Sequence, residues 1–263
     1  MPIYIRKQEM FNTNKVGRPI AVVKGGEDDG EKIYLDVDSV GKGGKIKKNY
    51  FADLKIDDGV FQQLPDTSRE RDCIIIAGQS GSGKSWWANA YAKEYKKAYP
   101  RRPIYFCSVL DEDSSIDKKV VKRINIDESW IDEPLTIEDV KECLVIMDDV
   151  EMIKEKPIRE ALFTFINSIL TTGRHTKTSI ILTTHYPNHQ HIRNFLNEAH
   201  NFVYFPYGSN RATNYVLENY IGLGKKDIIA IKKLKTRWAS VFKSFPQCVL
   251  TEHNIFTVAD MDN

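Results

Sequence analysis

The chain has 263 residues, with 38 lysines and arginines against 36 aspartates and glutamates, and so carries a formal net charge of +2. This length suits one sizeable hydrophobic core with a small appendage, and the near balance of charge excludes a whole-molecule field that would attract nucleic acid. The four cysteines form no C-x-x-C pair, which favours reduced core thiols. Because no apolar run approaches the length of a membrane span and the first residues lack a signal-peptide core, we expect a soluble intracellular protein without a membrane partner.

Residues 1–70 differ in pattern from the rest of the chain. Short alternating runs such as "KIYLDV" and "GKIKKNYFADLKI" are broken by "GGEDDG" and "GKGG", and such runs between glycine turns indicate β-strands. No catalytic constellation stands among them. We therefore predict a small β-rich N-terminal region over 1–70 and a second domain over 71–263.

In this second domain, strand-like and helix-like segments alternate. The apolar strand-like runs are "CIIIA", "PIYFCSV", "CLVIMDD" and "SIILTTH", and helical patterns lie between them over 84–99, 136–142 and 158–172. This alternation predicts an α/β fold with a mostly parallel central sheet and helices on both faces. "NFVYF" adds a further strand, and "RWASVFKSFPQCVLTEHNIFTV" predicts a C-terminal extension of two or three short antiparallel strands.

A glycine-rich loop stands between the first of these strands and the first helix. It matches G-x-x-x-x-G-K-[ST] at every position, through Gly78, Gln79, Ser80, Gly81, Ser82, Gly83, Lys84 and Ser85. Successive backbone N–H groups of such a loop surround a phosphate at the positive end of the helix. We expect Lys84 to reach the β- and γ-phosphates of ATP and Ser85 to bind Mg²⁺. We expect Trp86 and Trp87 to pack in the core rather than stack on a base.

Carboxylates follow the apolar strand "CLVIM". If the loop holds a nucleoside triphosphate, a second strand should end in an acid that holds the water shell of Mg²⁺. Asp148 is the predicted magnesium carboxylate, and Asp149 would orient and deprotonate the attacking water, with Glu151 as the alternative base. The other reading is a solvated acidic turn. The two adjacent acids favour hydrolysis over phosphoryl transfer to a small-molecule hydroxyl.

Polar residues also end the strand "SIILTTH". Thr183, Thr184 and His185 stand where open α/β sheets place their ligands. A group there can hydrogen-bond the γ-phosphate or the attacking water, although His185 could equally be a surface histidine. The nearby His189 and His191 have no cysteine or glutamate at a familiar zinc spacing.

These motifs together resemble the genome-packaging ATPases of large DNA viruses, in the HerA/FtsK superfamily of P-loop NTPases. The resemblance covers about Arg71 to Phe205 and rests on "GQSGSGKS", "CLVIMDD" and "SIILTTH" preceded by "TTGRHTKT". It implies a homo-oligomeric ring that hydrolyses ATP to drive double-stranded DNA into a capsid, with capsid proteins as partners and the host cytoplasm or the virion as its location. By position it gives catalytic roles to Lys84, Asp149 and His185, and makes Arg174 the candidate arginine finger for a neighbouring subunit. His185 stands where the superfamily more often has glutamine or asparagine.

Three other function classes are alternatives to this one or fit the sequence less well. An ATP-binding scaffold or assembly factor and a helicase-like or AAA-type remodelling ATPase are the alternatives. A GTPase fits less well because "GKKD" lacks the asparagine of the guanine-reading N-K-x-D and "DDVE" lacks the glycine of D-x-x-G.

One segment carries a local nucleic-acid signal. Between 225 and 243 there are seven basic residues against one acid, with aromatic residues interleaved. Basic side chains that neutralise phosphates bind DNA without reading its sequence, as a motor requires, although a lysine-rich helix face is often only solvated. The loop "GKGGKIKK", from Gly41 to Lys48, is a second candidate. The seven basic residues are Lys225, Lys226, Lys232, Lys233, Lys235, Arg237 and Lys243.

Overall fold

The computed structural model describes residues 4–5, 10–36, 53–110 and 112–258. The predicted α/β class is confirmed, with a large and partly parallel sheet between layers of helices. The candidate loop Gly41 to Lys48 lies outside the described residues. Among the described residues, no helix is both long and apolar enough to cross a bilayer.

The central sheet has eleven strands in the order β1-β5-β15-β14-β13-β12-β7-β11-β10-β8-β9. The six strands from β12 to β9 run parallel to one another, and the other five continue the sheet antiparallel. The parallel strands are β7 (Cys73–Ala77), β8 (Ile104–Ser108), β9 (Lys122–Asn125), β10 (Leu144–Met147), β11 (Ser179–Thr184) and β12 (Asn201–Tyr204). The antiparallel strands are β1 (Tyr4–Ile5), β5 (Asp53–Lys55), β13 (Ala239–Phe242), β14 (Cys248–Thr251) and β15 (Asn254–Thr257).

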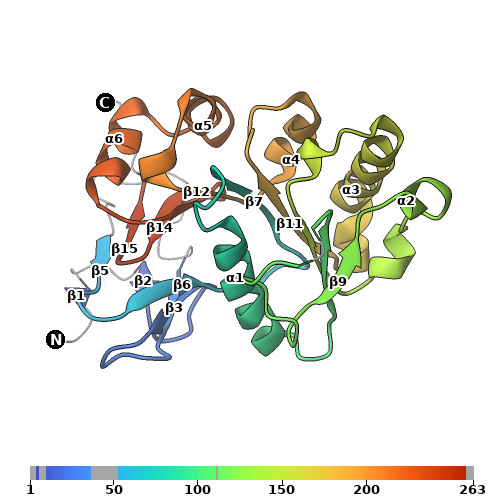
Figure 1. Cartoon of the computed structure of the whole chain (residues 1–263). Coiled ribbons are helices and arrows are strands. Elements are labelled where there is room, and N and C mark those ends of the chain that lie inside the picture. The colour runs from blue at the N-terminus through green and yellow to red at the C-terminus, as the bar shows by residue number, and fades with distance from the viewer. Residues whose placement is uncertain (1–3, 6–9, 37–52, 111, 259–263) are drawn as a thin grey trace.

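Helices cover one face of this sheet, and a helix together with a second sheet covers the other (Figure 1). Alternate residues of β7 explain the division, because successive side chains of a strand point to opposite faces. Cys73 and Ile75 pack with α3, while Ile74 and Ile76 pack with α1 and the N-terminal strands. The helices are α1 (Lys84–Ala98), α2 (Ser129–Asp132), α3 (Lys156–Thr176), α4 (Arg193–Glu198), α5 (Arg211–Val216) and α6 (Lys225–Lys233), with a π-helical turn over Leu217–Ile221.

The second sheet is formed by residues of the predicted β-rich region. Its four strands follow the order β2-β4-β3-β6, and α1 packs beside β6. Two further strands of the same region, β1 and β5, join the far side of the central sheet, where β5 pairs with β15. The strands of the second sheet are β2 (Phe11–Asn12), β3 (Arg18–Lys24), β4 (Lys32–Leu35) and β6 (Val60–Gln63).

Two predicted helices differ from the structure. The helix expected to end at Thr172 continues through Gly173 to Thr176, and the left-handed Lys177, with φ 54°, ends it. Gly173 is needed inside the helix because a Cβ there would lie 2.7 Å from Nη1 of Arg71, whose guanidinium hydrogen-bonds helix carbonyls. The helix expected over 136–142 is only a 3₁₀ turn, Ile137–Val140.

Candidate nucleotide site

The glycine-rich loop leaves β7 at the edge where the parallel strands end and leads into α1. The N–H of Gly78 donates to the carbonyl of Thr184 at 3.0 Å, so the loop is tied to the end of the neighbouring strand β11. A Cβ on Gly78 would lie 2.7 Å from the ring of Phe205, so only glycine allows this approach. Gly83 has φ 106°, a conformation that a side chain would strain. The loop therefore needs its glycines for its shape.

Lys84 reaches from the first turn of α1 to the ends of two other strands. Its Nζ lies 3.2 Å from the carbonyl oxygen of Gly78, 3.2 Å from Nε2 of His185 and 3.5 Å from Oδ2 of Asp149. Nε2 of His185 lies only 2.7 Å from the same Asp149 oxygen, which is the distance of a charge-assisted hydrogen bond. We therefore place the proton on Nε2, donated to Asp149, and the contact between Lys84 and His185 is not a second hydrogen bond.

Asp148 and Asp149 are held by hydroxyl groups from the strands on either side of β10. The Thr183 hydroxyl of β11 lies 2.8 Å from Oδ1 of Asp148 and 3.1 Å from Oδ1 of Asp149, and it accepts the N–H of Asp149 at 3.0 Å. Ser108, at the end of β8, donates to Oδ2 of Asp148 at 3.3 Å. Burial, together with the neighbouring charge of Asp149, raises the pKa of Asp148. The pair therefore carries negative charge that a cation would stabilise.

Glu151 links the acidic turn to the end of β11. Its Oε1 accepts the Thr184 hydroxyl at 2.6 Å and the N–H of His185 at 2.7 Å, which fixes the backbone that carries the His185 ring. Its Oε2 is buried and has no hydrogen-bond partner, and the same holds for Oγ of Ser82 in the loop. Buried polar atoms without partners are costly, so both atoms mark capacity for a ligand or water.

The structure thus brings together Lys84, Asp148, Asp149 and His185, as the sequence predicted for their positions. Arg174 lies apart, near the end of α3, where the next strand begins. It is 72% exposed and its Nε lies 3.5 Å from Glu70, so its assignment as a finger remains a prediction. Sequence reasoning missed Ser108, although a polar residue at the end of an apolar strand is a usable signal.

Magnesium fits the site through few protein ligands. Ser85 and Asp148 are the predicted ligands, and the described residues contain no cluster of three or more His, Cys, Asp or Glu able to hold a metal. Mg²⁺ usually keeps several waters and takes one or two carboxylates with substrate phosphates, so a sparse ligand set is what it requires. The rings of His189 and His191 have centroids 5.2 Å apart and are tilted by 36°.

Comparison with known sequences places the chain in a family. No protein-family model matches it. It is 36% identical over 251 residues to "Uncharacterized protein V3" of Sputnik virophage, in an alignment that covers 94% of this chain and 98% of V3. The chain belongs to the family of this virophage protein.

Solved structures share the fold. The cytoplasmic domain of the Type VII secretion ATPase EccC from Thermomonospora curvata superposes with a TM-score of 0.52 at 11% identity, over 83% of this chain and 30% of that chain. The genome-packaging NTPase B204 of Sulfolobus turreted icosahedral virus 2, in complex with AMPPCP, gives a TM-score of 0.47 at 16% identity, over 69% of this chain and 98% of that chain. The superposition with EccC shows that this chain shares the fold of P-loop ATPases.

The structure also locates the basic segment 225–243. Tyr204 of β12 lies beside Ala77 of β7 and opposite Ala239 of the antiparallel β13, so the connection through α5 and α6 begins and ends at the phosphate-loop edge. Two of its basic residues have structural partners. Nζ of Lys243 donates to the carbonyls of Leu196 and Asn197, and Arg237 pairs with Glu252.

Proposed function

We propose that the protein hydrolyses ATP at the phosphate loop and is the motor subunit of a ring that moves double-stranded DNA into a capsid. The observation that carries the ATPase proposal is the convergence of the loop lysine with the strand-end acid and histidine. Lys84 Nζ lies within 3.5 Å of Asp149, and Asp149 lies 2.7 Å from His185. A lysine, a carboxylate and a proton carrier around one point are the groups that phosphoryl transfer to water requires.

Each residue has a role in this proposal. The loop amides and Lys84 hold the β- and γ-phosphates, Ser85 and Asp148 hold Mg²⁺, and Asp149 orients the attacking water. His185, fixed through its backbone by Glu151, contacts the γ-phosphate or that water. Mg²⁺ bound there neutralises developing charge on the phosphates. The phosphates would attract Lys84 away from Asp149, which frees the carboxylate to accept a proton.

The DNA-moving part of the proposal has separate support. B204 is described as a genome-packaging NTPase, and its fold resembles that of this chain. The basic α6 segment lies at the same edge of the sheet as the phosphate loop, which suits contact with DNA phosphates close to the site of hydrolysis. A ring would also give Arg174 a route into a neighbour's site.

The test is an ATPase assay of the purified chain with no DNA, with duplex DNA and with single-stranded DNA, using Lys84→Ala as the inactive control. A DNA motor should hydrolyse ATP and be stimulated by duplex DNA. Binding without turnover would favour the ATP-binding scaffold, and stimulation by single strands alone would favour a helicase-like enzyme. Hydrolysis with no response to either nucleic acid would contradict the DNA-moving role and leave the ATPase role standing.

A further inference from the structure

Trp86 is not a core residue, contrary to the expectation from the sequence. Trp87 is fully buried against Tyr91 and Trp238, whereas Trp86 is 45% exposed. Trp86 directly follows Ser85, the predicted magnesium residue, and consecutive Cα atoms are only about 3.8 Å apart. A large aromatic ring therefore stands in water beside the loop that would hold the phosphates.

Arg237 covers part of this ring and is itself fixed. Its guanidinium carbon lies 5.1 Å from the centroid of the Trp86 ring, a cation–π distance. Glu252, which is only 7% exposed, accepts the Nε–H and the backbone N–H of Arg237, both at 2.7 Å. The arginine thus packs over a ring that remains 45% exposed and can contact a planar ligand.

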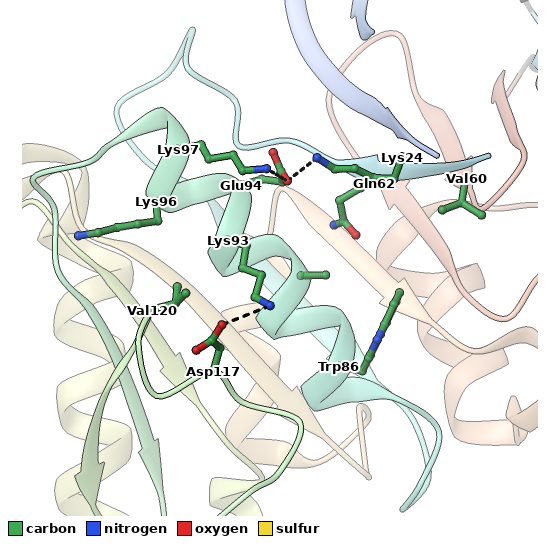
Figure 2. A pocket seen from close by; sticks show the side chains of 11 residues that line it. Lys24, Val60, Gln62, Trp86, Lys93, Glu94, Lys96, Lys97, Asp117 and Val120 are labelled. Carbon is green, nitrogen blue, oxygen red and sulfur yellow. Dashed lines mark hydrogen bonds and ion pairs between the residues drawn. The ribbon is translucent and has the colours of Figure 1, made fainter. Parts of the chain in front are cut away.

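Trp86 also lines a groove of about 620 Å³ along the outer side of α1, between that helix and the second sheet (Figure 2). The volume lies within the usual range for small-ligand sites, roughly 300–1,000 Å³. Besides its charged residues, the groove is lined by Val60 and Gln62 of β6 and by Trp86 and Ala90 of α1. These side chains carry no charge.

The groove is also lined by lysines, but each of them has a partner. Lys24 and Lys97 both pair with Oε1 of Glu94, at 2.8 and 2.9 Å. Lys93 pairs with Asp117 at 3.3 Å, and Lys96 donates to the carbonyl of Arg102 at 3.1 Å. A nucleic-acid backbone would have to displace these partners. The exposed ring of Trp86 instead favours a flat ligand at its end of the groove.

We propose that this end of the groove is the nucleobase subsite, with the base of the bound nucleotide stacked on Trp86. The proposal rests on the proposed ATPase function and extends it to the other half of the substrate. Stacking on an aromatic ring contributes about 1–3 kcal/mol per base and tolerates any base, because every base has a π-face. Trp86 therefore raises the affinity for nucleotides generally, and ATP and GTP should both depend on it.

The experiment compares two ligands that share phosphates and differ in the base. Isothermal titration with AMPPCP and with inorganic tripolyphosphate is carried out on the wild type, Trp86→Ala and Trp86→Phe. Trp86→Ala should bind AMPPCP about fivefold more weakly or worse and tripolyphosphate within twofold of the wild type. Trp86→Phe, which keeps a ring, should recover most of the loss. Tyr207→Ala is the matched control, since Tyr207 is an aromatic residue, 68% exposed, that follows β12 at the same sheet edge.

Each other outcome overturns the subsite in a distinguishable way. Wild-type affinity of Trp86→Ala for AMPPCP would refute the stacking while the ATPase proposal stands. An equal loss for AMPPCP and tripolyphosphate would mean that Trp86 only shapes the loop. A loss of DNA binding with unchanged AMPPCP binding would assign the groove to nucleic acid. Failure of the wild type to bind either ligand would refute the proposed function together with the subsite.

Discussion

At the edge of the sheet where the parallel strands end, Lys84, Asp149 and His185 crowd around one point, and Oε2 of Glu151 is buried without a partner. At the opposite edge, where the strands begin, Asp72 is also buried, but its Oδ2 accepts the Tyr91 hydroxyl at 2.7 Å and the N–H of Asp66 at 3.0 Å. Both edges bury charge. At the first edge a lysine lies within 3.5 Å of both a carboxylate and a histidine, whereas Asp72 is occupied by a tyrosine hydroxyl and a backbone N–H, so chemistry is expected at the first edge and structural support at the second.

The largest effect is expected from Lys84. Lys84→Ala should abolish ATP hydrolysis and weaken ATP binding, because no other described side chain of the chain is placed to reach the β- and γ-phosphates from the loop.

Asp149→Asn should keep ATP binding and lose turnover by on the order of 10²-fold or more, as expected when a water-orienting group is removed. Steady-state kcat and titration with AMPPCP measure the two quantities. Wild-type turnover in Asp149→Asn would move the base assignment to Glu151, to be tested with Glu151→Gln.

Arg174 tests whether a residue at the edge where the strands begin can take part in catalysis. It stands at the edge where strands begin, paired only loosely with Glu70 at 3.5 Å, and so cannot serve the site of its own subunit from there. If it enters a neighbour's site, Arg174→Ala should bind ATP normally and hydrolyse it ~10³-fold more slowly. Mixing it with Asp149→Asn should restore some activity, since each variant completes a site that the other cannot. Proven co-assembly without any rescue would rule out the trans arrangement.

The sequence predicted that these residues lie together because the signals that place them are local, while their catalytic roles stay predictions. The loop residues are contiguous, and the partners of Lys84 stand at the ends of two apolar strands whose parallel pairing brings their ends together. The exposure of Trp86 was missed, although the helical period through Trp87, Tyr91 and Tyr95 places Trp86 outside the buried stripe. The helical period alone therefore predicts an exposed Trp86 beside a buried Trp87.

Other features depend on contacts between distant parts of the chain. The pairing of β5 with β15 joins residues 53–55 to residues 254–256, and no local pattern specifies such a partner. In the sequence, Gly173 resembles a residue that ends a helix. In the structure it lies inside the helix, because the Arg71 guanidinium, about 100 residues away, occupies the space that a side chain would need. The strand β9 is short and lies at the sheet edge, where its side chains are largely solvated and give no apolar signal.

Substitutions at the edge where the strands begin should change the stability of the protein rather than its ATPase activity. Burial raises the pKa of Asp72 to about 6, and the positive charge of Arg69 offsets this only in part. The folded state therefore binds the Asp72 proton more tightly than the unfolded state does, and the free energy of unfolding falls as pH rises from about 4 to 6. Burial lowers the pKa of His200 to about 3, so its effect is a gain in stability as pH rises from about 3 to 6.5. Nδ1 of His200 accepts the N–H of Cys73 at 3.2 Å, so the histidine is neutral rather than ion-paired with Asp72. The two effects oppose each other.

Single substitutions at Asp72 and His200 should therefore give opposite slopes of the free energy of unfolding against pH. Asp72→Asn should leave the His200 effect, so stability rises with pH between 4 and 6. His200→Gln should leave the Asp72 effect, a fall of about 3 kcal/mol over the same range, from the shift of Asp72 at 1.36 kcal/mol per pKa unit. Urea unfolding at a series of pH values measures both, with ATPase activity at pH 7 as the control that should not change. Identical slopes for the two variants would refute the opposing pair.

The smallest effect, and the one that bears on DNA rather than ATP, concerns the lysines that follow α5 at the phosphate-loop edge. Because Arg237 is held by Glu252 and Trp86, the test variant leaves it in place and changes to Gln the three lysines at the C-terminal end of α6 and just after it, Lys232, Lys233 and Lys235. Neutralising three phosphates should contribute about 2.7 to the slope of log affinity against log salt, at roughly 0.9 per phosphate. The variant should flatten the slope of duplex binding by up to that amount for all DNA sequences alike, while basal ATPase activity survives.

The matched control changes Lys118, Lys119 and Lys122, three exposed lysines next to the opposite end of the central sheet, to Gln and so removes the same charge. If both triple variants flatten the slope equally, the effect is one of net charge, and if neither does, the DNA path lies away from α6.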